Sequence, residues 1–147
     1  MGLLDFVASA GAKLFGGGGK SDEERAAILQ NSVLKMGLEV ENLNVQVKED
    51  VASVSGKTST QAIREKILLT VGNTEGVARV DDLIEVVTPE PEAAYYTVKS
   101  GDTLSKIAKE YYGNAMKYPV IFEANKPMLE NPDLIYPGQV LRIPPQD

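Results

Sequence analysis

The first fifteen residues carry apolar side chains at the spacing of a helix: Leu3, Phe6, Val7, Ala10 and Leu14. Intervals of three and four residues place these side chains on one face, so the pattern predicts a short amphipathic helix. A helix of this length is marginal by itself and needs a surface to pack on. We expect it to dock on the rest of the chain, with the glycines of residues 16–19 as a hinge, so that residues 1–19 form one N-terminal segment. Membrane-surface binding is the alternative, which the polar face does not favour because it is not rich in lysine.

Residues 20–88 switch between helical and strand periods in the order α-β-β-α-β. Ser21 is followed three residues later by Glu24, and this capping box opens a helix that we expect to end at Gly37. Apolar and polar residues then alternate twice between residues 43 and 56, which predicts two half-buried strands. The polar residues between the two runs predict a tight turn.

The second half of this segment is predicted as a helix, a glycine-containing turn and a strand. The helix covers Thr60–Val71 and has one apolar face. The turn, Gly72–Gly76, leaves the last helix carbonyls without intrahelical partners, and its glycines let the backbone fold those oxygens around a point. A helix cap with a turn is the plainer interpretation, and a monovalent-cation site is the other. A strand over 77–87 follows, with a bulge near Ala78–Arg79 because Val77 is out of phase.

Residues 89–94 contain two prolines and two glutamates, and they are predicted as a linker. From residue 95 to 147 the pattern predicts the order β-α-α-β. The strands are expected at Tyr96–Val98 and Val140–Ile143, with a first helix from Thr103 onward. The sequence therefore predicts an α+β chain of two small domains, joined by a short connection.

The composition excludes several classes of function. The chain has 147 residues, a net charge of −6 and no cysteine, histidine or tryptophan. The negative charge and the lack of a basic cluster argue against nucleic acid as a partner. Without cysteine and histidine there is no thiolate or imidazole metal site and no Cys-His or Ser-His nucleophile, so we expect no enzymatic activity. Residues 1–15 do not resemble a secretory signal and no 18-residue apolar span occurs, so we expect a cytoplasmic chain without stable membrane insertion.

Two stretches resemble known domain families. The hydrophobic-Gly-Asn-x-x-Gly-Val turn at 71–77, with the Val80-Asp81-Asp82 that follows it, resembles the BON domain, which would span residues 20–88. Residues 95–147 resemble the LysM domain almost position by position. The segment starts with Tyr-Thr-Val-Lys-Ser-Gly-Asp-Thr-Leu and ends with Ile-Tyr-Pro-Gly-Gln-Val-Leu-Arg-Ile-Pro. These resemblances imply the two folds that the periodicities predict.

The LysM resemblance also implies a glycan groove. LysM modules usually bind the N-acetylglucosamine of peptidoglycan or chitin between the loop after the first strand and the loop before the second. Carried over to this chain, the groove would use eight residues: Gly101, Asp102, Thr103, Leu104, Pro132, Asp133, Leu134 and Ile135. The other interpretation is that these residues cap a helix and close the small core. BON domains are mostly associated with the cell envelope, so an envelope adaptor that binds peptidoglycan is the alternative function, and it would require export.

The combination of one BON domain with one LysM domain is similar to a family of small cytoplasmic potassium-binding proteins. The resemblance spans essentially the full length and includes Met1-Gly2-Leu3, Phe6-Val7 and Ala10-Gly11. It implies selective K⁺ binding, with Rb⁺ and Cs⁺ as further candidate ions, and a change of conformation on loading. It also implies a role as a K⁺ sensor or buffer in osmotic stress. A third class of function is the docking of a protein partner through the LysM domain; we expect the chain to be a monomer.

The residues are chemically consistent with K⁺ as the ligand. K⁺ is large and weakly hydrated, and rings of neutral carbonyls bind it well, whereas a carboxylate cage would favour divalent ions. Turn geometry and the resemblance together predict main-chain carbonyl ligands from two segments: Val7, Ala10, Gly72, Thr74, Gly76 and Val77. The first two are expected at the end of the N-terminal helix.

Overall fold

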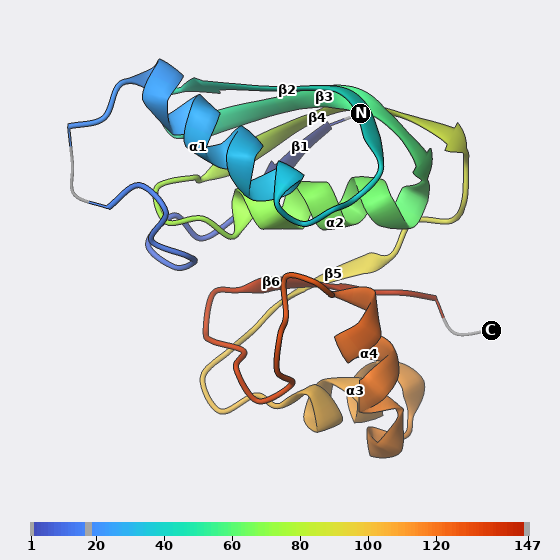
Figure 1. The fold of residues 1–147 in the computed structure, drawn as a ribbon. Helices are drawn as coiled ribbons and strands as arrows, with labels where there is room; N and C mark the ends of the chain where they lie inside the picture. The colour runs from blue at the N-terminus through green and yellow to red at the C-terminus, as the bar shows by residue number, and fades with distance from the viewer. Residues whose placement is uncertain (1, 17–18, 146–147) are drawn as a thin grey trace.

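We describe the protein from a computed structural model, in which residues 2–16 and 19–145 are placed. Figure 1 shows two units, an upper one built on a four-stranded sheet and a lower one built on a two-stranded sheet. Both units combine helices with strands, which confirms the α+β class expected from the sequence. Residues 17 and 18, part of the predicted glycine hinge, lie outside the described residues.

The first unit contains the predicted α-β-β-α-β order. The elements are α1 (Asp22–Leu34), β2 (Val40–Lys48), β3 (Val51–Thr60), α2 (Gln61–Gly72) and β4 (Arg79–Thr88). The predicted capping box is present, because the Glu24 amide donates to Ser21 Oγ and the Ser21 amide donates to Glu24 Oε1, both at 3.1 Å. Thr60 caps α2 by accepting from the Ile63 amide at 3.2 Å. These side chains fix where the two helices begin.

The four strands lie in the order β1-β4-β3-β2. β2 and β3 form an antiparallel hairpin, and α2 carries the chain from β3 to β4, which runs parallel to β3. Figure 1 shows α1 and α2 on the same face of the sheet, and the apolar core lies between them and the strands. The sequence predicts a bulge near Ala78–Arg79, because Val77 is out of phase with the strand. In the structure β4 begins at Arg79, so Val77 lies before the strand. The amides of Ala78 and Arg79 both donate to the Asp50 carbonyl there, at 2.9 and 3.3 Å.

The predicted N-terminal helix is wrong, because Gly2–Asp5 form a strand, β1, that pairs antiparallel with β4. Leu4 is the register partner of Val80, and Leu4 and Phe6 both pack against the core, so the buried positions here have a period of two. Without β1, the edge of β4 would present a row of unpaired amides and carbonyls. Pairing with β4 satisfies these groups and buries Leu4 and Phe6, which outweighs a helix too short to be stable by itself.

The second unit has the predicted β-α-α-β order. Its elements are β5 (Ala94–Thr97), α3 (Leu104–Tyr112), the short 3-10 helix η1 (Ala115–Lys117), α4 (Tyr118–Ala124) and β6 (Val140–Ile143). β5 and β6 pair antiparallel, and both helices contribute to a separate core. The buried residues of this core are Val98, Leu104, Ile107, Ala108, Ile121, Leu129, Leu141 and Ile143. Each unit therefore has its own apolar core, as an independent domain requires.

The two units meet where α2 lies against β6 (Figure 1). Glu65 of α2 is fully buried, and its Oε1 accepts a hydrogen bond from Arg142 Nε of β6 at 2.8 Å. The other carboxylate oxygen accepts from the Gln61 side chain at 2.9 Å and from the Ala93 amide at 3.0 Å. Ala93, within the predicted linker, is thus buried at this contact. A buried charge with a full set of partners holds the second unit on α2.

Candidate cation site

The turn after β1 lies against the turn after α2. Four main-chain hydrogen bonds join them: Phe6 N to Ala78 O at 2.9 Å, Ala12 N to Asn73 O at 2.9 Å, Glu75 N to Ala12 O at 2.9 Å, and Gly76 N to Ala8 O at 2.8 Å. The structure therefore brings together the two segments that contain the predicted carbonyl ligands, residues 7–10 and 72–77. The first segment is a turn, closed by the Ala10 amide and the Val7 carbonyl at 3.0 Å, and it is not the helix end that the sequence predicts.

Two glycines allow this close approach of the turns. Gly11 has a φ of +102°, and a Cβ at this position would lie 2.6 Å from the carbonyl carbon and oxygen of Asn73. Gly72 ends α2, and a Cβ there would lie 2.1 Å from the ring of Phe6. The backbone of one turn thus packs on the backbone of the other, and the Phe6 ring packs directly on the helix end. A larger residue at either glycine would push the turns apart.

The predicted carbonyls differ in whether they already accept a hydrogen bond. Val7 and Thr74 each accept one, from the amides of Ala10 and Val77 at 3.0 Å. Among the described residues, no main-chain hydrogen bond outside the helices and strands ends on the other four carbonyls: Ala10, Gly72, Gly76 and Val77. Buried carbonyls in folded proteins nearly always have a partner. Because Gly72 and Val77 are buried residues, carbonyls without a main-chain donor at this turn are consistent with a bound ligand.

The chemistry of this donor set fits a large monovalent cation. All six predicted ligands are neutral main-chain oxygens, and the C-terminal end of α2 adds partial negative charge from the helix dipole. Within the described ranges, no three Asp, Glu, His or Cys side chains gather into a group that could hold a metal ion. Neutral oxygens without carboxylates suit K⁺ better than Ca²⁺ or Mg²⁺.

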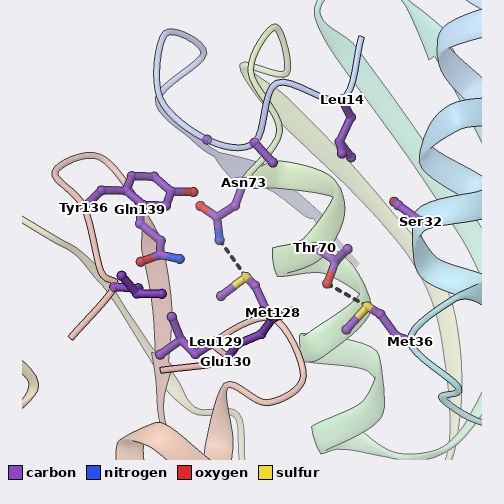
Figure 2. Close-up of a pocket in the computed structure, with 13 residues that line it drawn as sticks. Leu14, Ser32, Met36, Thr70, Asn73, Met128, Leu129, Glu130, Tyr136 and Gln139 are labelled. Atoms are coloured by element: carbon purple, nitrogen blue, oxygen red, sulfur yellow. Dashed lines mark hydrogen bonds between the residues drawn. The ribbon is translucent and has the colours of Figure 1, made fainter. Parts of the chain in front are cut away.

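A groove of about 370 Å³ borders this site and lies beside the contact between the two units (Figure 2). Residues of both units line it, including Gly11, Thr70 and Asn73 from the first, and Met128, Tyr136 and Gln139 from the second. Figure 2 shows the Asn73 side chain directed toward Met128, and its Nδ2 donates to the thioether sulfur at 3.2 Å. The candidate cation site is therefore next to the second unit rather than on a remote face of the first.

The first predicted glycan loop is largely engaged inside the second unit. The Asp102 carboxylate accepts from the Tyr96 hydroxyl and from the Lys99 amide at 2.8 Å. Thr103 is the N-cap of α3, and its hydroxyl accepts from the Lys106 amide at 3.2 Å. Leu104 belongs to the apolar core, and the Gly101 carbonyl accepts from the Lys106 ammonium at 3.1 Å. These contacts agree with helix capping and core closure.

The second predicted glycan loop is more open. Ile135 packs against the core of the second unit, and the Asp133 amide donates to the Asn131 side chain at 2.8 Å. Pro132 is partly buried, whereas the Leu134 side chain is 64% exposed. This loop therefore offers one large apolar side chain to solvent, next to polar groups that are satisfied locally.

The Asp102 contact predicts that the stability of the second unit depends on pH. Hydrogen bonds from Tyr96 and Lys99 lower the pKa of Asp102, so the stabilisation is present above the usual carboxyl pKa and is lost as pH falls through the lowered one. The hydrogen bond to Asp102 also raises the pKa of Tyr96 to about 12. We expect Asp102→Asn to cost about 1 kcal/mol at neutral pH and to reduce the loss of stability in acid. Urea midpoints measured from pH 2 to 7 check this, with the exposed Asp133→Asn as control; identical acid limbs in wild type and Asp102→Asn would contradict it.

Comparison with known families agrees with both motifs. The BON domain family matches residues 21–88, and the LysM domain family matches residues 96–144. The resemblances read from the glycine turn and from the Tyr-Thr-Val…Ile-Pro segment are therefore confirmed. Together with the folds described above, these matches define a protein that combines one BON domain with one LysM domain.

The chain is 49% identical to "Potassium binding protein Kbp" of Escherichia coli O6:H1 (strain CFT073), over 98% of this chain and 99% of that relative. It therefore belongs to the family of that potassium-binding protein. Two partial relatives share short segments. An uncharacterized protein of Deinococcus radiodurans is 61% identical over 33% of this chain and 19% of its own length. Esterase Rv1288 of Mycobacterium tuberculosis is 45% identical over 36% of this chain and 11% of its own length.

Several residues that shape the site were not identified from the sequence. Gly11 and Phe6 stand in a stretch predicted as a helix, so their packing on Asn73 and Gly72 could not be read from it. The Asn73 side chain also reaches β6, 67 residues away in the sequence. The one available signal was Gly11, because a glycine in the middle of a predicted short helix weakly disfavours that helix.

Proposed function

We propose that this chain binds K⁺ through main-chain carbonyls of the N-terminal turn and of the turn after α2. The predicted ligands are Val7, Ala10, Gly72, Thr74, Gly76 and Val77. The single observation that carries the proposal is the junction of these two turns: among the described residues, no main-chain hydrogen bond outside the helices and strands ends on the carbonyls of the buried residues Gly72 and Val77. The full-length relative, whose name states that it binds potassium, supports the choice of ion. Rb⁺ and Cs⁺ are the other ions that such a cage of carbonyls would accept.

Ion binding would change the conformation through the same junction. Carbonyl dipoles that point at one place repel each other, and a cation between them removes that repulsion. Loading would therefore favour the state in which the N-terminal turn is docked on residues 72–77. The ligand shifts the population toward the docked state in proportion to its differential affinity for the two states. This makes the chain a sensor or buffer of K⁺ without any catalytic step.

Calorimetric titration of ion-depleted protein tests the function. We expect saturable heat with KCl, no saturable heat with NaCl at matched ionic strength, and faster amide exchange in residues 6–12 when K⁺ is withdrawn. An N-acetylglucosamine oligomer is the third ligand, because it tests the alternative role of the LysM groove. Heat with the oligomer and none with K⁺ would reject the cation proposal. It would also make the envelope adaptor the working function.

Location, partners and catalysis complete the proposal. None of the helices in the described parts of the chain is long and apolar enough to cross a membrane. We propose a cytoplasmic, non-enzymatic monomer, which fractionation and sedimentation can test. The partial match to an esterase spans only 11% of that protein, so its name does not bear on the chemistry of this chain. A protein partner of the LysM domain remains a separate prediction.

A further inference from the structure

Asn73 connects the candidate cation site to the LysM unit by hydrogen bonds. Its side chain is 6% exposed, and both ends of the amide bind Val140, the first residue of β6. Asn73 Nδ2 donates to the Val140 carbonyl at 2.8 Å, and the Val140 amide donates to Asn73 Oδ1 at 2.8 Å. A side-chain amide that takes both main-chain groups of one strand residue fixes its position in two directions.

The main chain of Asn73 connects the same point to two further segments. Its amide donates to the Leu69 carbonyl at 2.8 Å, which closes the last turn of α2. Its carbonyl accepts from the Ala12 amide of the N-terminal turn at 2.9 Å. Gly72 and Thr74, the residues on either side of Asn73, are both predicted ion ligands. A displacement of Asn73 would therefore move two ligand carbonyls together.

Gly138 makes the second contact between the LysM unit and the site. It has a φ of +91°, and a Cβ there would lie 2.6 Å from the Ala10 Cβ and 3.5 Å from the Val7 Cβ. The Gly138 amide donates to the Val98 carbonyl at 2.8 Å, so its place is fixed by the LysM fold. The turn before β6 thus packs against Val7 and Ala10, the two N-terminal residues whose carbonyls are predicted to bind the ion.

We infer that Asn73 and Gly138 are positioning residues of the cation cage, an inference that rests on the proposed function. Each of the two ligand-bearing turns has its own contact with the LysM domain, one through Asn73 and the other through Gly138. Docking of the LysM domain thus holds the two turns in a fixed position relative to each other. An ion that binds to both turns in turn stabilises the docked state. Such coupling is reciprocal: domain docking raises the affinity for the ion by the same factor by which the bound ion favours domain docking.

The plainer explanation is that these contacts only join the domains, as the Glu65–Arg142 pair does. The two explanations predict different results. Glu65 lies eight residues before Asn73, which is about two turns of helix, so its loss would weaken docking at a distance from the cage. If general docking were sufficient, Glu65→Gln and Asn73→Ala would reduce K⁺ affinity alike. If Asn73 positions the cage, its loss reduces affinity by more.

The test uses full-length variants with two readouts, K⁺ affinity and amide exchange at Val140 in buffer without K⁺. We expect Asn73→Ala and Gly138→Ala to raise the Kd for K⁺ by about 5–150-fold, the usual range of coupling between sites. In Asn73→Ala, Val140 should also exchange faster without any ion present. In wild type, added K⁺ should slow that exchange. Gly101→Ala is the matched control for Gly138, because Gly101 has a φ of +87° in the same domain and, within the described part of the chain, no non-adjacent atom lies within 4 Å of a Cβ there.

The outcomes separate this inference from the function on which it rests. Wild type that fails to bind K⁺ overturns both. Wild type that binds K⁺, with Asn73→Ala and Gly138→Ala equal to it in affinity, overturns the positioning role and leaves the function intact. An affinity loss in Glu65→Gln as large as that in Asn73→Ala assigns the effect to domain docking and also overturns the positioning role. A loss confined to Asn73→Ala and Gly138→Ala, with Gly101→Ala unchanged, supports it.

Discussion

Gly11→Ala is expected to weaken K⁺ binding by about 30-fold or more, since each 1.4 kcal/mol corresponds to a factor of ten. A Cβ at Gly11 would overlap the main chain of Asn73, at 2.6 Å from its carbonyl carbon and oxygen. Overpacking of this kind costs about 1–3 kcal/mol, and a left-handed conformation costs a residue with a Cβ about 1–2 kcal/mol more. Both costs arise when the N-terminal turn docks, so they act directly against ion binding. Calorimetric titration with KCl measures the loss.

The matched control for Gly11→Ala is Gly16→Ala. Gly16 also has a positive φ, of +65°, and belongs to the same N-terminal segment, but no atom of the non-adjacent described residues lies within 4 Å of a Cβ there. We expect the control to bind K⁺ with nearly the affinity of wild type. Equal affinity in Gly11→Ala and wild type would show that the N-terminal turn supplies no part of the site. Deletion of the segment is a poorer test than this substitution, because it also removes strand β1 from the sheet.

Glu65→Gln is expected to lower the free energy of unfolding by about 3 kcal/mol, the lower end of the cost of breaking a buried ion pair. Glu65 is fully buried and Arg142 is 7% exposed, so the substitution leaves the guanidinium charge without a counter-ion away from water. It also weakens the acceptor for the Ala93 amide. Thermal unfolding in K⁺-free buffer measures the change.

Two further variants check the physical reason for this loss. Arg142→Met combined with Glu65→Gln removes both charges, and we expect the double variant to lose less stability than the sum of the two single variants. Glu123→Gln removes the acid of the exposed Lys126 pair, and it should cost at most about 1 kcal/mol. A loss in Glu65→Gln as small as that in Glu123→Gln would contradict a buried, desolvated pair.

Local sequence patterns were sufficient for most of the fold. Ser21 with Glu24 predicted the start of α1, and the alternation between residues 43 and 56 predicted the β2–β3 hairpin. The glycine turn after α2 and the Tyr-Thr-Val…Ile-Pro segment indicated the BON and LysM families. These signals are local, because caps, strand alternation and turns depend on residues a few positions apart.

The N-terminal segment shows where local pattern is insufficient. Leu3, Phe6, Val7 and Ala10 satisfy helical spacing, while Leu4 and Phe6 also satisfy the alternation of a strand. Both patterns fit a stretch of this length, so the sequence could not decide between them. The open edge of β4, which is formed by residues about 75 positions later, selected the strand.

For the candidate cation site, too, some features follow from the local sequence and others only from the tertiary structure. By itself, the sequence indicated that α2 ends at Gly72 and that its last carbonyls lack intrahelical partners there, because a helix end always leaves such carbonyls. Only the tertiary structure decided what surrounds them: the N-terminal turn packed on Gly72 and Asn73, the Val140 amide and carbonyl on the Asn73 side chain, and Gly138 against Ala10. These neighbours come from two distant parts of the chain, the N-terminal turn and residues 138–140, and no local propensity encodes their meeting. Their positions follow from burying the two cores and pairing the strands, which brings the segments together.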